Sequence, residues 1–571
     1  MCGILFSART YISGNPEDDS LKELLLKLQT ANARRGPDAQ QSIEFVESSK
    51  DGNERLALRF YSSELRLRGD EPVVQPHYAG HGSDILCFNG EIFDGVDIKP
   101  HENDGRKFYE LLQACQSSEE IRDCIGGIEG PYAFVFYQNS TGRIFFARDP
   151  LGRRSLLIHR PTECNPHFIL TSVSIGYHPE YQLEEIDTTM LFCLELRGVG
   201  SSNGSLCRVN RDLPENPPLL SSLDVIPDFL SATVDDLIRE LDRSVRLKVE
   251  CIPRPSEAKS KSSVAVLFSG GIDSAILAFL AHRHIPLEEP IDLLNVAFEN
   301  PRKIQGKVSG SKKRGNKPRN EQEEQITADV SWLVPDRISG LKETEELRRL
   351  CPGRRWNFVE INIPYQEYQD ARETVESLMF PSQTVMDLSL AMALYFASRG
   401  NGITRKHPDA APEPYSSPAR VLLNGLGSDE LFGGYSRHRT AYNTSGWTAV
   451  IDELQLELER IPTRNLGRDD RVVSSHGKET RHPFLSLAFL NFIAQLPVHH
   501  KMDPRTELGT GDKMLLRLAT RKLGLLEASS RRKRAMQFGS HSARMEGGGV
   551  QRRGDLLVTG VSRNFPDMTI E

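Results

Sequence analysis

The chain lacks the features that would direct it to a membrane, to a nucleic acid or to the secretory pathway. None of its apolar runs approaches the roughly 18 residues needed to cross a bilayer. Its net charge of −7 leaves no basic surplus for binding a nucleic acid. Its nine cysteines include no Cys-x-x-Cys pair, and its fifteen histidines form no metal-ligand spacing. We therefore expect a cytoplasmic protein with reduced thiols and with no membrane or nucleic-acid partner.

The distribution of apolar residues divides the chain into two regions of different architecture. Residues 4–200 contain many short apolar runs separated by turn residues, and one amphipathic segment at 20–33. From residue 232 onward, buried-strand patterns alternate with helical patterns, as in an α/β sheet. Residues 201–231 are rich in proline and serine, which indicates a linker. Compositions typical of disorder occur at 301–325, 404–419 and in the tail 546–571.

The chain begins Met1-Cys2-Gly3, and the initiator methionine is removed only before small residues such as Cys2. An N-terminal cysteine combines a thiol nucleophile with an α-amine that can accept the thiol proton. That amine has an ordinary pKa of about 8, so it can act as a base near neutral pH. Such a residue is suited to attack the carbon of an amide. Taken alone, however, Cys2 could simply be a small residue at the start of the chain.

Four short motifs follow Cys2 and decide between these readings. They are Arg35-Gly36-Pro37-Asp38, Gln75-Pro76, Asn89-Gly90-Glu91 and Asn103-Asp104. In this order they resemble the glutaminase domain of the class II glutamine amidotransferases, and most closely that of the asparagine synthetases. The resemblance implies an α+β N-terminal nucleophile sandwich with αββα layers over residues 2–200.

The same resemblance implies a role for each of these residues. Cys2 is the expected nucleophile, and Asn89 and Gly90 are the expected donors to the oxyanion. A side-chain amide and a backbone N–H suit that task because both are preorganised donors. Asn89, Glu91 and Asp104 are the expected glutamine-binding residues. Asn-Gly is also a common hairpin turn, but separate turns are an unlikely source of all four motifs in this order.

A second strong signal is Ser269-Gly270-Gly271-Ile272-Asp273-Ser274. It follows the apolar run 264–268 and precedes the helical composition of 275–281. A glycine-rich turn between a strand and a helix is the geometry that binds phosphate. Because no Walker A lysine is present in the turn, the motif instead resembles the PP-loop of ATP pyrophosphatases, which cleave ATP to AMP and pyrophosphate.

Two further motifs extend the resemblance to asparagine synthetases. Residues 424–435 resemble their second signature, and residues 481–485 match their Arg-x-Pro-Phe-Leu. The resemblance implies an α/β PP-loop domain over 232–545, with Asp273 and Asp429 as Mg²⁺ ligands. The implied ATP-binding residues are Leu267, Ser269, Gly270, Gly271, Asp273, Ser274, Val296 and Gly425. Glutamine, ATP and aspartate are thus the expected small-molecule partners, with no indication of oligomeric state.

Three positions depart from the asparagine synthetase pattern. Glu64 stands where the family has an arginine that binds the glutamine carboxylate, although Arg66 or Arg68 could replace it. Leu426 replaces a glutamate of the second signature, and leucine has no acid–base chemistry. Ala535 occupies the place of a catalytic lysine, with cationic side chains one and two residues earlier.

Several segments closely resemble the asparagine synthetase domain-containing protein 1 family, a divergent eukaryotic branch. They are residues 89–93, 152–157, 464–472 and 533–539. Three functions stay open on the sequence. The first is glutamine-dependent, ATP-driven amidation of aspartate, which would make the chain a ligase. The second is a degenerate ATP-binding scaffold or sensor. The third is a glutaminase that serves another acceptor.

Overall fold

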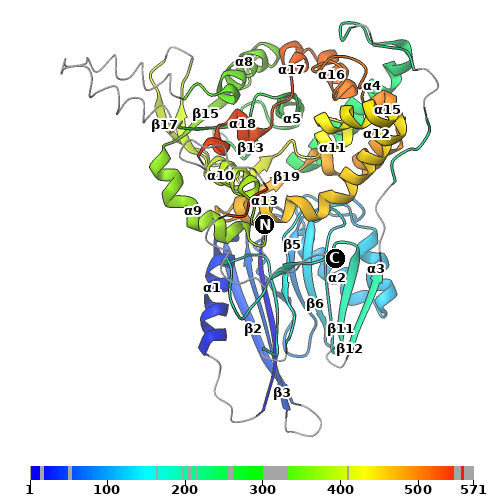
Figure 1. Cartoon of the computed structure of the whole chain (residues 1–571). Coiled ribbons are helices and arrows are strands. Elements are labelled where there is room, and N and C mark those ends of the chain that lie inside the picture. Colours follow the sequence, from blue (N-terminus) through cyan, green and yellow to red (C-terminus); the bar gives the residue numbers. More distant parts are fainter. Residues whose placement is uncertain are drawn as a thin grey trace, which may run out of the picture.

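The computed structural model describes most of the chain, in two domains that stack end to end (Figure 1). The described residues are 2–12, 19–48, 54–162, 165–195, 198–203, 208–213, 217–220, 222–254, 261–299, 332–407, 410–545 and 555–558. In Figure 1 the N-terminal domain, in blue and cyan, lies below the helix-rich C-terminal domain.

The N-terminal domain contains two antiparallel six-stranded sheets. One has the order β10-β8-β9-β1-β3-β2, and the other β12-β11-β7-β6-β5-β4. The strands of the first are β1 (Gly3–Ile12), β2 (Ala39–Ser48), β3 (Glu54–Glu64), β8 (Leu157–His159), β9 (His167–Thr171) and β10 (Glu184–Glu185). Those of the second are β4 (His77–Tyr78), β5 (Ile85–Gly90), β6 (Tyr132–Gln138), β7 (Arg143–Arg148), β11 (Met190–Glu195) and β12 (Gly198–Asn203).

Successive side chains along each strand point to opposite faces of the sheet, and both faces of each sheet carry apolar side chains. The inner faces meet in a core that includes Phe6, Phe60 and Val135. Helix α1 (Asp19–Arg35) covers the outer face of the first sheet, where Leu24 and Leu28 belong to one cluster with strand residues. Helices α2 (Asp104–Ala114) and α3 (Ser118–Gly126) cover the second. The predicted αββα layering is confirmed.

The C-terminal domain is built on a seven-stranded sheet of order β17-β16-β15-β14-β13-β18-β19. Neighbouring strands from β15 to β19 in this order pair in parallel, whereas β16 pairs antiparallel with both β15 and β17. The strands are β13 (Val264–Leu267), β14 (Ile291–Phe298), β15 (Trp356–Ile363), β16 (Asn401–Thr404), β17 (Glu413–Ser416), β18 (Val421–Leu423) and β19 (Glu479–Arg481). Since β13 has β14 on one side and β18 on the other, the strand order reverses there, and ligands bind at such reversal points.

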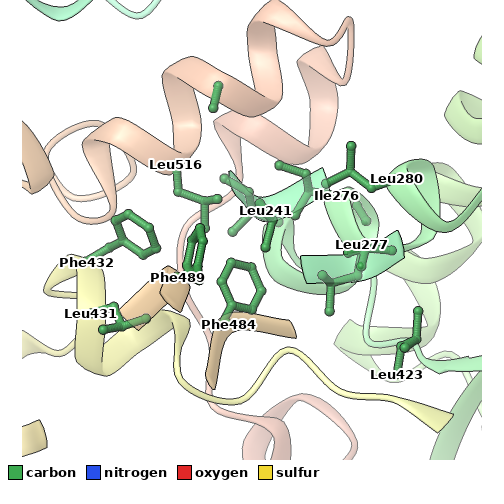
Figure 2. Close-up of a cluster of buried hydrophobic side chains, with 14 of the residues drawn as sticks. Leu241, Ile276, Leu277, Leu280, Leu423, Leu431, Phe432, Phe484, Phe489 and Leu516 are labelled. Atoms are coloured by element: carbon green, nitrogen blue, oxygen red, sulfur yellow. The ribbon is translucent and has the colours of Figure 1, made fainter. Parts of the chain in front are cut away.

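Helices cover both faces of this sheet, which confirms the predicted α/β class. They are α4 (Asp228–Val249), α5 (Ile272–His284), α8 (Pro335–Leu350), α9 (Tyr365–Met379), α10 (Val385–Arg399), α11 (Ser428–Phe432), α12 (Ser436–Arg464), α13 (Leu466–Ser474), α14 (Leu487–Gln495), α15 (Val498–Lys501), α16 (Met514–Lys522), α17 (Leu526–Ser530) and α18 (Met536–Gly539). Figure 2 shows part of the larger core, where Leu241 and Ile276 face the rings of Phe484 and Phe489. This packing holds α5 against the helices that follow β18 and β19.

The prediction of disorder at 404–419 is wrong for the part that the structure describes. Strands β16 and β17 form an antiparallel hairpin there, in which Ile403 pairs with Pro414. Proline is tolerated because β17 is the edge strand and needs no further ladder bond. The Tyr415 hydroxyl donates to Asp292 at 3.0 Å, which ties the hairpin to β14. Composition alone could not reveal this contact.

The other predicted irregular segments are only partly visible. The insert 301–325 lies outside the described residues. Within the tail 546–571, only 555–558 is described, and Leu557 there forms a β-bridge with Thr384. Regular structure also enters the predicted linker 201–231 at both ends, because β12 runs to Asn203 and α4 begins at Asp228. The domain boundaries themselves stay predictions.

Buried ion pairs join the two domains. Arg35 at the end of α1 lies 2.7 Å from Asp470 of α13, and both side chains are almost fully buried. Asp470 also accepts a hydrogen bond from the backbone N–H of Ser155 at 3.0 Å. Arg154 contacts Glu479 of β19 at 2.9 Å. These charges are excluded from water only while the domains are docked.

Removal of one side chain from a buried ion pair of this interface should therefore lower the stability of the fold. We expect Asp470→Ala to lower the free energy of unfolding by about 3–5 kcal/mol, because Arg35 would stay buried without its counter-charge. Chemical denaturation followed by tryptophan fluorescence measures this. The control is Glu23→Ala, which breaks an exposed pair with Lys27 and should leave stability unchanged. Equal effects of the two substitutions would contradict the role of the interface.

Candidate active sites

The predicted nucleophile lies at the start of β1 and is buried. The backbone N–H of Cys2 donates to Oδ1 of Asn89 at 3.0 Å. The Gln75 side-chain amide donates to the Cys2 sulfur at 3.5 Å, so this residue of the Gln75-Pro76 motif also reaches the site. Burial raises the pKa of the Cys2 thiol to about 11. The thiol is thus protonated in this environment and needs a base before it can attack.

A donor suited to an oxyanion lies beside Cys2. Asn89 is fully buried at the end of β5, and its Nδ2 atom has no hydrogen-bond partner among the described residues. A buried donor without an acceptor destabilises the fold by about 1–3 kcal/mol, so a substrate oxygen that accepts this hydrogen bond would be bound favourably. Gly90 follows, and a Cβ at this position would lie 2.6 Å from the carbonyl oxygen of Pro131. The structure thus places Asn89 in contact with Cys2, with Gly90 next in the chain.

The predicted glutamine-binding carboxylates lie nearby, but each already has partners. Asp104 begins α2, and its oxygens accept from the backbone N–H groups of Ile92 at 2.9 Å and Gly105 at 3.0 Å. Burial raises the pKa of the Asp104 carboxyl. Glu91 accepts from Arg481 of β19 at 3.0 Å, and Arg68 approaches it to 3.9 Å. Glu91 therefore belongs to the domain interface as well as to the N-terminal site.

Glu64 ends β3 and is 3% exposed. Its Oε1 lies 3.8 Å from Arg66, while its Oε2 has no hydrogen-bond partner in the described part of the chain. Burial raises the pKa of the Glu64 carboxyl to about 7. The carboxylate in turn raises the pKa of the Cys2 thiol, which indicates that the two groups lie close together. A buried acid thus lies near the predicted nucleophile.

The second site forms where the strand order reverses. Gly270 has φ +73°, and a Cβ there would lie 2.3 Å from the backbone nitrogen of Gly340. This close packing admits only glycine, and it turns the chain sharply into α5. The N-cap of α5 is Gly271, so the helix begins with free N–H groups, as a phosphate site requires.

Two adjoining cavities open at this loop. One of about 300 Å³ is lined by most of the predicted ATP-binding residues, namely Leu267, Ser269, Asp273, Ser274, Val296 and Gly425. The other, of about 230 Å³, is lined by Gly270 and Gly271 and by basic residues, namely Lys513, Arg517, Arg531, Arg532, Lys533 and Arg534. From the sequence we predicted the glycines, the carboxylates and the two cations that precede Ala535. The other basic residues that line this cavity, which also come from the region after residue 512, were not predicted.

Lys513 is the residue that sequence reasoning missed most clearly. Its ammonium lies 2.7 Å from Asp273, 2.8 Å from Asp429 and 2.9 Å from the Ser428 hydroxyl. Gly434 makes room for it, since a Cβ there would lie 2.6 Å from the Lys513 Cε atom. The only local signal is a lysine directly before the helical pattern of α16, and many surface lysines share that feature.

The two predicted Mg²⁺ ligands converge on the same point. Burial favours the neutral form of Asp429, but Lys513 and Lys533 outweigh it and hold the pKa of this carboxyl below its ordinary range. Mg²⁺ is usually held by one or two carboxylates together with substrate phosphates, so Asp273 and Asp429 fit such an ion. The fit requires the Lys513 ammonium to move aside. Within the described residues, no group of three or more acidic, histidine or cysteine side chains could hold a metal.

Two of the three departures from the family pattern, Leu426 and Ala535, line the larger cavity. Leu426 follows Gly425 in the loop after β18, and Ala535 is the N-cap of α18. Lys533 reaches into the same cavity, where its ammonium pairs with Asp429 and lies 4.2 Å from the centre of the Tyr435 ring. A cation thus lies in this cavity although residue 535 is an alanine. Leu426 supplies no acid–base group, but two carboxylates, Asp387 and Asp469, line the same cavity.

One arginine connects the two sites. The Arg481 side chain donates to Glu91 at 3.0 Å and to Glu479 at 2.6 Å. Its carbonyl oxygen accepts from the backbone N–H of Asn424, the residue before Gly425, at 3.0 Å. Arg481 therefore contacts the loop of the N-terminal site and the loop of the second cavity at once.

Two family models match parts of this chain. A family model for the glutamine amidotransferase domain matches residues 1–197, and one for asparagine synthase matches residues 442–566. Among solved structures, a glutamine phosphoribosylpyrophosphate amidotransferase from B. subtilis aligns with a TM-score of 0.26 at 14% identity, over 56% of this chain and 70% of that one. A score this low carries no weight for the fold.

Among the described helices, none is long and apolar enough to span a bilayer.

Curated relatives match nearly the whole chain. Asparagine synthetase domain-containing protein 1 of Gallus gallus is 34% identical, over 90% of this chain and 93% of the relative. The Homo sapiens protein of the same name is 34% identical over 96% of each chain. Asparagine synthetase domain-containing protein YML096W of Saccharomyces cerevisiae is 32% identical over 92% of this chain and 90% of the relative. The chain belongs to the asparagine synthetase domain-containing protein 1 family.

Proposed function

We propose that this protein hydrolyses a glutamine side-chain amide at Cys2 and uses the ammonia to amidate an ATP-activated carboxylate. Aspartate is the acceptor that the asparagine synthetase resemblance implies. The observation that carries the proposal is the buried contact of Arg481 with both Glu91 and the Asn424 loop. A nucleophile site and a phosphate-binding loop that share one buried interface are arranged for one combined reaction.

At the N-terminal site, the first requirement is a base for the Cys2 thiol. After Met1 is removed, the α-amine of Cys2 supplies that base. The sulfur then attacks the amide carbon, and the Asn89 Nδ2 atom, which lacks a partner among the described residues, donates to the developing oxyanion. Gly90 lets the backbone lie close to the same oxygen.

At the second site, the glycine loop and the basic wall would hold the three phosphates of ATP. Asp273 and Asp429 would hold Mg²⁺, which neutralises charge on the β- and γ-phosphates. Lys513 and Lys533 lie where that charge increases as pyrophosphate departs. The apolar part of the larger cavity, which includes Leu390 and Leu394, suits an adenine ring.

Leu426 favours a second candidate function. Because leucine cannot move a proton, the cavity could bind ATP without efficient amidation. The protein would then serve as an ATP-binding scaffold or sensor, or as a glutaminase for a different acceptor. The scaffold or sensor would keep the fold and ATP binding without catalysis, whereas the glutaminase would keep the Cys2 chemistry and use a different acceptor.

The nucleophile proposal makes a direct prediction. Mass spectrometry of the intact protein should show that Met1 is absent, and Cys2→Ala should reduce ammonia release from glutamine to the background rate. Cys251→Ala, which removes a half-buried thiol outside both sites, should retain full activity. Retention of Met1, or activity in Cys2→Ala, would exclude Cys2 as the nucleophile.

The ATP proposal predicts a metal-dependent gain in stability. Mg·ATP at 100 times its Kd should stabilise the protein by about 2.7 kcal/mol. Asp273→Asn should lose most of that gain because one of the two metal-binding carboxylates is neutralised. Asp452→Asn, at an exposed position on α12, should keep it. The measurement is the shift in Tm with and without Mg·ATP in each variant, and equal shifts would place the nucleotide elsewhere.

A further inference from the structure

We propose that Glu64 makes the Cys2 site prefer a glutamine whose α-carboxyl group is blocked as an amide over free glutamine. The inference rests on the proposed hydrolysis at Cys2 and specifies the substrate class of that site. An amide-blocked glutamine keeps its side-chain amide and its α-ammonium group, but presents N–H donors where free glutamine carries a negative charge.

The backbone holds Glu64 beside the nucleophile. Ser63 pairs with Gly3 in the β1–β3 register, so Glu64 at the end of β3 is the cross-strand neighbour of the Cys2 end of β1. The loop at Gly36 packs directly on this strand end, since a Cβ there would lie 2.3 Å from the Glu64 nitrogen. Glu64 therefore has little freedom to leave the pocket.

The Glu64 side chain has an unused acceptor. It is 3% exposed, and its Oε2 atom has no hydrogen-bond partner among the described residues. A buried carboxylate oxygen of this kind is costly unless a ligand donates to it. The N–H of a blocked carboxyl group is such a donor. A free substrate carboxylate would instead meet a like charge, which disfavours binding.

The neighbouring arginines do not cancel this charge. Arg66 lies 3.8 Å from Glu64 and is about one-third exposed, so solvent screens its attraction to the Glu64 carboxylate. Arg68 is buried but donates to the Ile92 carbonyl and approaches Glu91, on the side where Asp104 lies. Asp38, also close to Glu64, is itself negative and is held by Arg420. Of the charges that act on Glu64, Arg66 and the amino terminus are positive and Asp38 and Asp104 are negative, so they offset one another and leave the Glu64 carboxylate as an acidic group beside Cys2.

The chemistry is ordinary amide hydrolysis. The Cys2 sulfur bonds to the side-chain carbonyl carbon, the C–N bond breaks, and ammonia leaves with the thiol proton. Water then adds its hydroxyl to the thioester carbon and returns a proton to the sulfur. The α-carboxamide stays intact, and the products are ammonia and glutamic acid α-amide.

The test compares L-glutaminamide with L-glutamine as substrates of the full chain at pH 8, where Glu64 is ionised. We expect kcat/KM for side-chain ammonia release to favour glutaminamide by at least about tenfold. Product analysis must show loss of the side-chain nitrogen. Glu64→Gln should narrow the preference, and Glu64→Arg should reverse it by lowering KM for glutamine. Glu44→Gln, an exposed glutamate on β2, should leave the ratio unchanged.

The outcomes separate this inference from the proposed function. A wild-type ratio that favours free glutamine, or a ratio that Glu64→Gln leaves unchanged in a folded protein, overturns the role of Glu64 alone. Failure of the folded, Met1-free wild type to release ammonia from either compound overturns the proposed hydrolysis and this inference together. The wild-type ratio requires no variant to fold, so the inference stays testable if a substitution destabilises the chain.

Discussion

The structure depends on a chain of buried charges between its two domains. Arg35, Arg154 and Arg481 meet Asp470, Glu479 and Glu91 across the interface. Each group has been taken out of water, so each is stable only while its partner stays in place. Because Arg481 also holds the Asn424 backbone, the same charges that dock the domains fix the loops of both sites.

The three departures from the family pattern have different structural consequences. Position 535 carries no cation, but Lys533, two residues earlier, places one in the same cavity. Leu426 has no acid–base group, while the carboxylates of Asp387 and Asp469 line the same cavity. Glu64 places a buried acid near Cys2, while Cys2 and Asn89 stay in direct contact. The departure at Glu64 therefore lies close to the predicted nucleophile without separating it from Asn89.

Residues whose role depends on local backbone geometry were predictable from the sequence. The Ser269–Ser274 loop combines glycines, a strand and a helix within a few residues, and Cys2 derives its chemistry from its own position. The sequence did not predict the contacts of Lys513 and Arg481, or the hairpin at 401–416. Their roles depend on partners that are distant in sequence, such as Asp273 for Lys513 and Glu91 for Arg481. No periodicity or composition reports such contacts, and proline-rich composition at 404–419 indicated the opposite of the edge strand that forms.

The central claim is that the ATP site activates a carboxylate. The most direct measurement is aspartate-dependent exchange of labelled pyrophosphate into ATP, with Mg²⁺ present and with no amide donor. The account predicts exchange that requires both aspartate and Mg²⁺, because the carboxylate displaces pyrophosphate before ammonia is needed. Absence of exchange in a folded protein that binds Mg·ATP would contradict the claim and favour the scaffold or alternative-acceptor function.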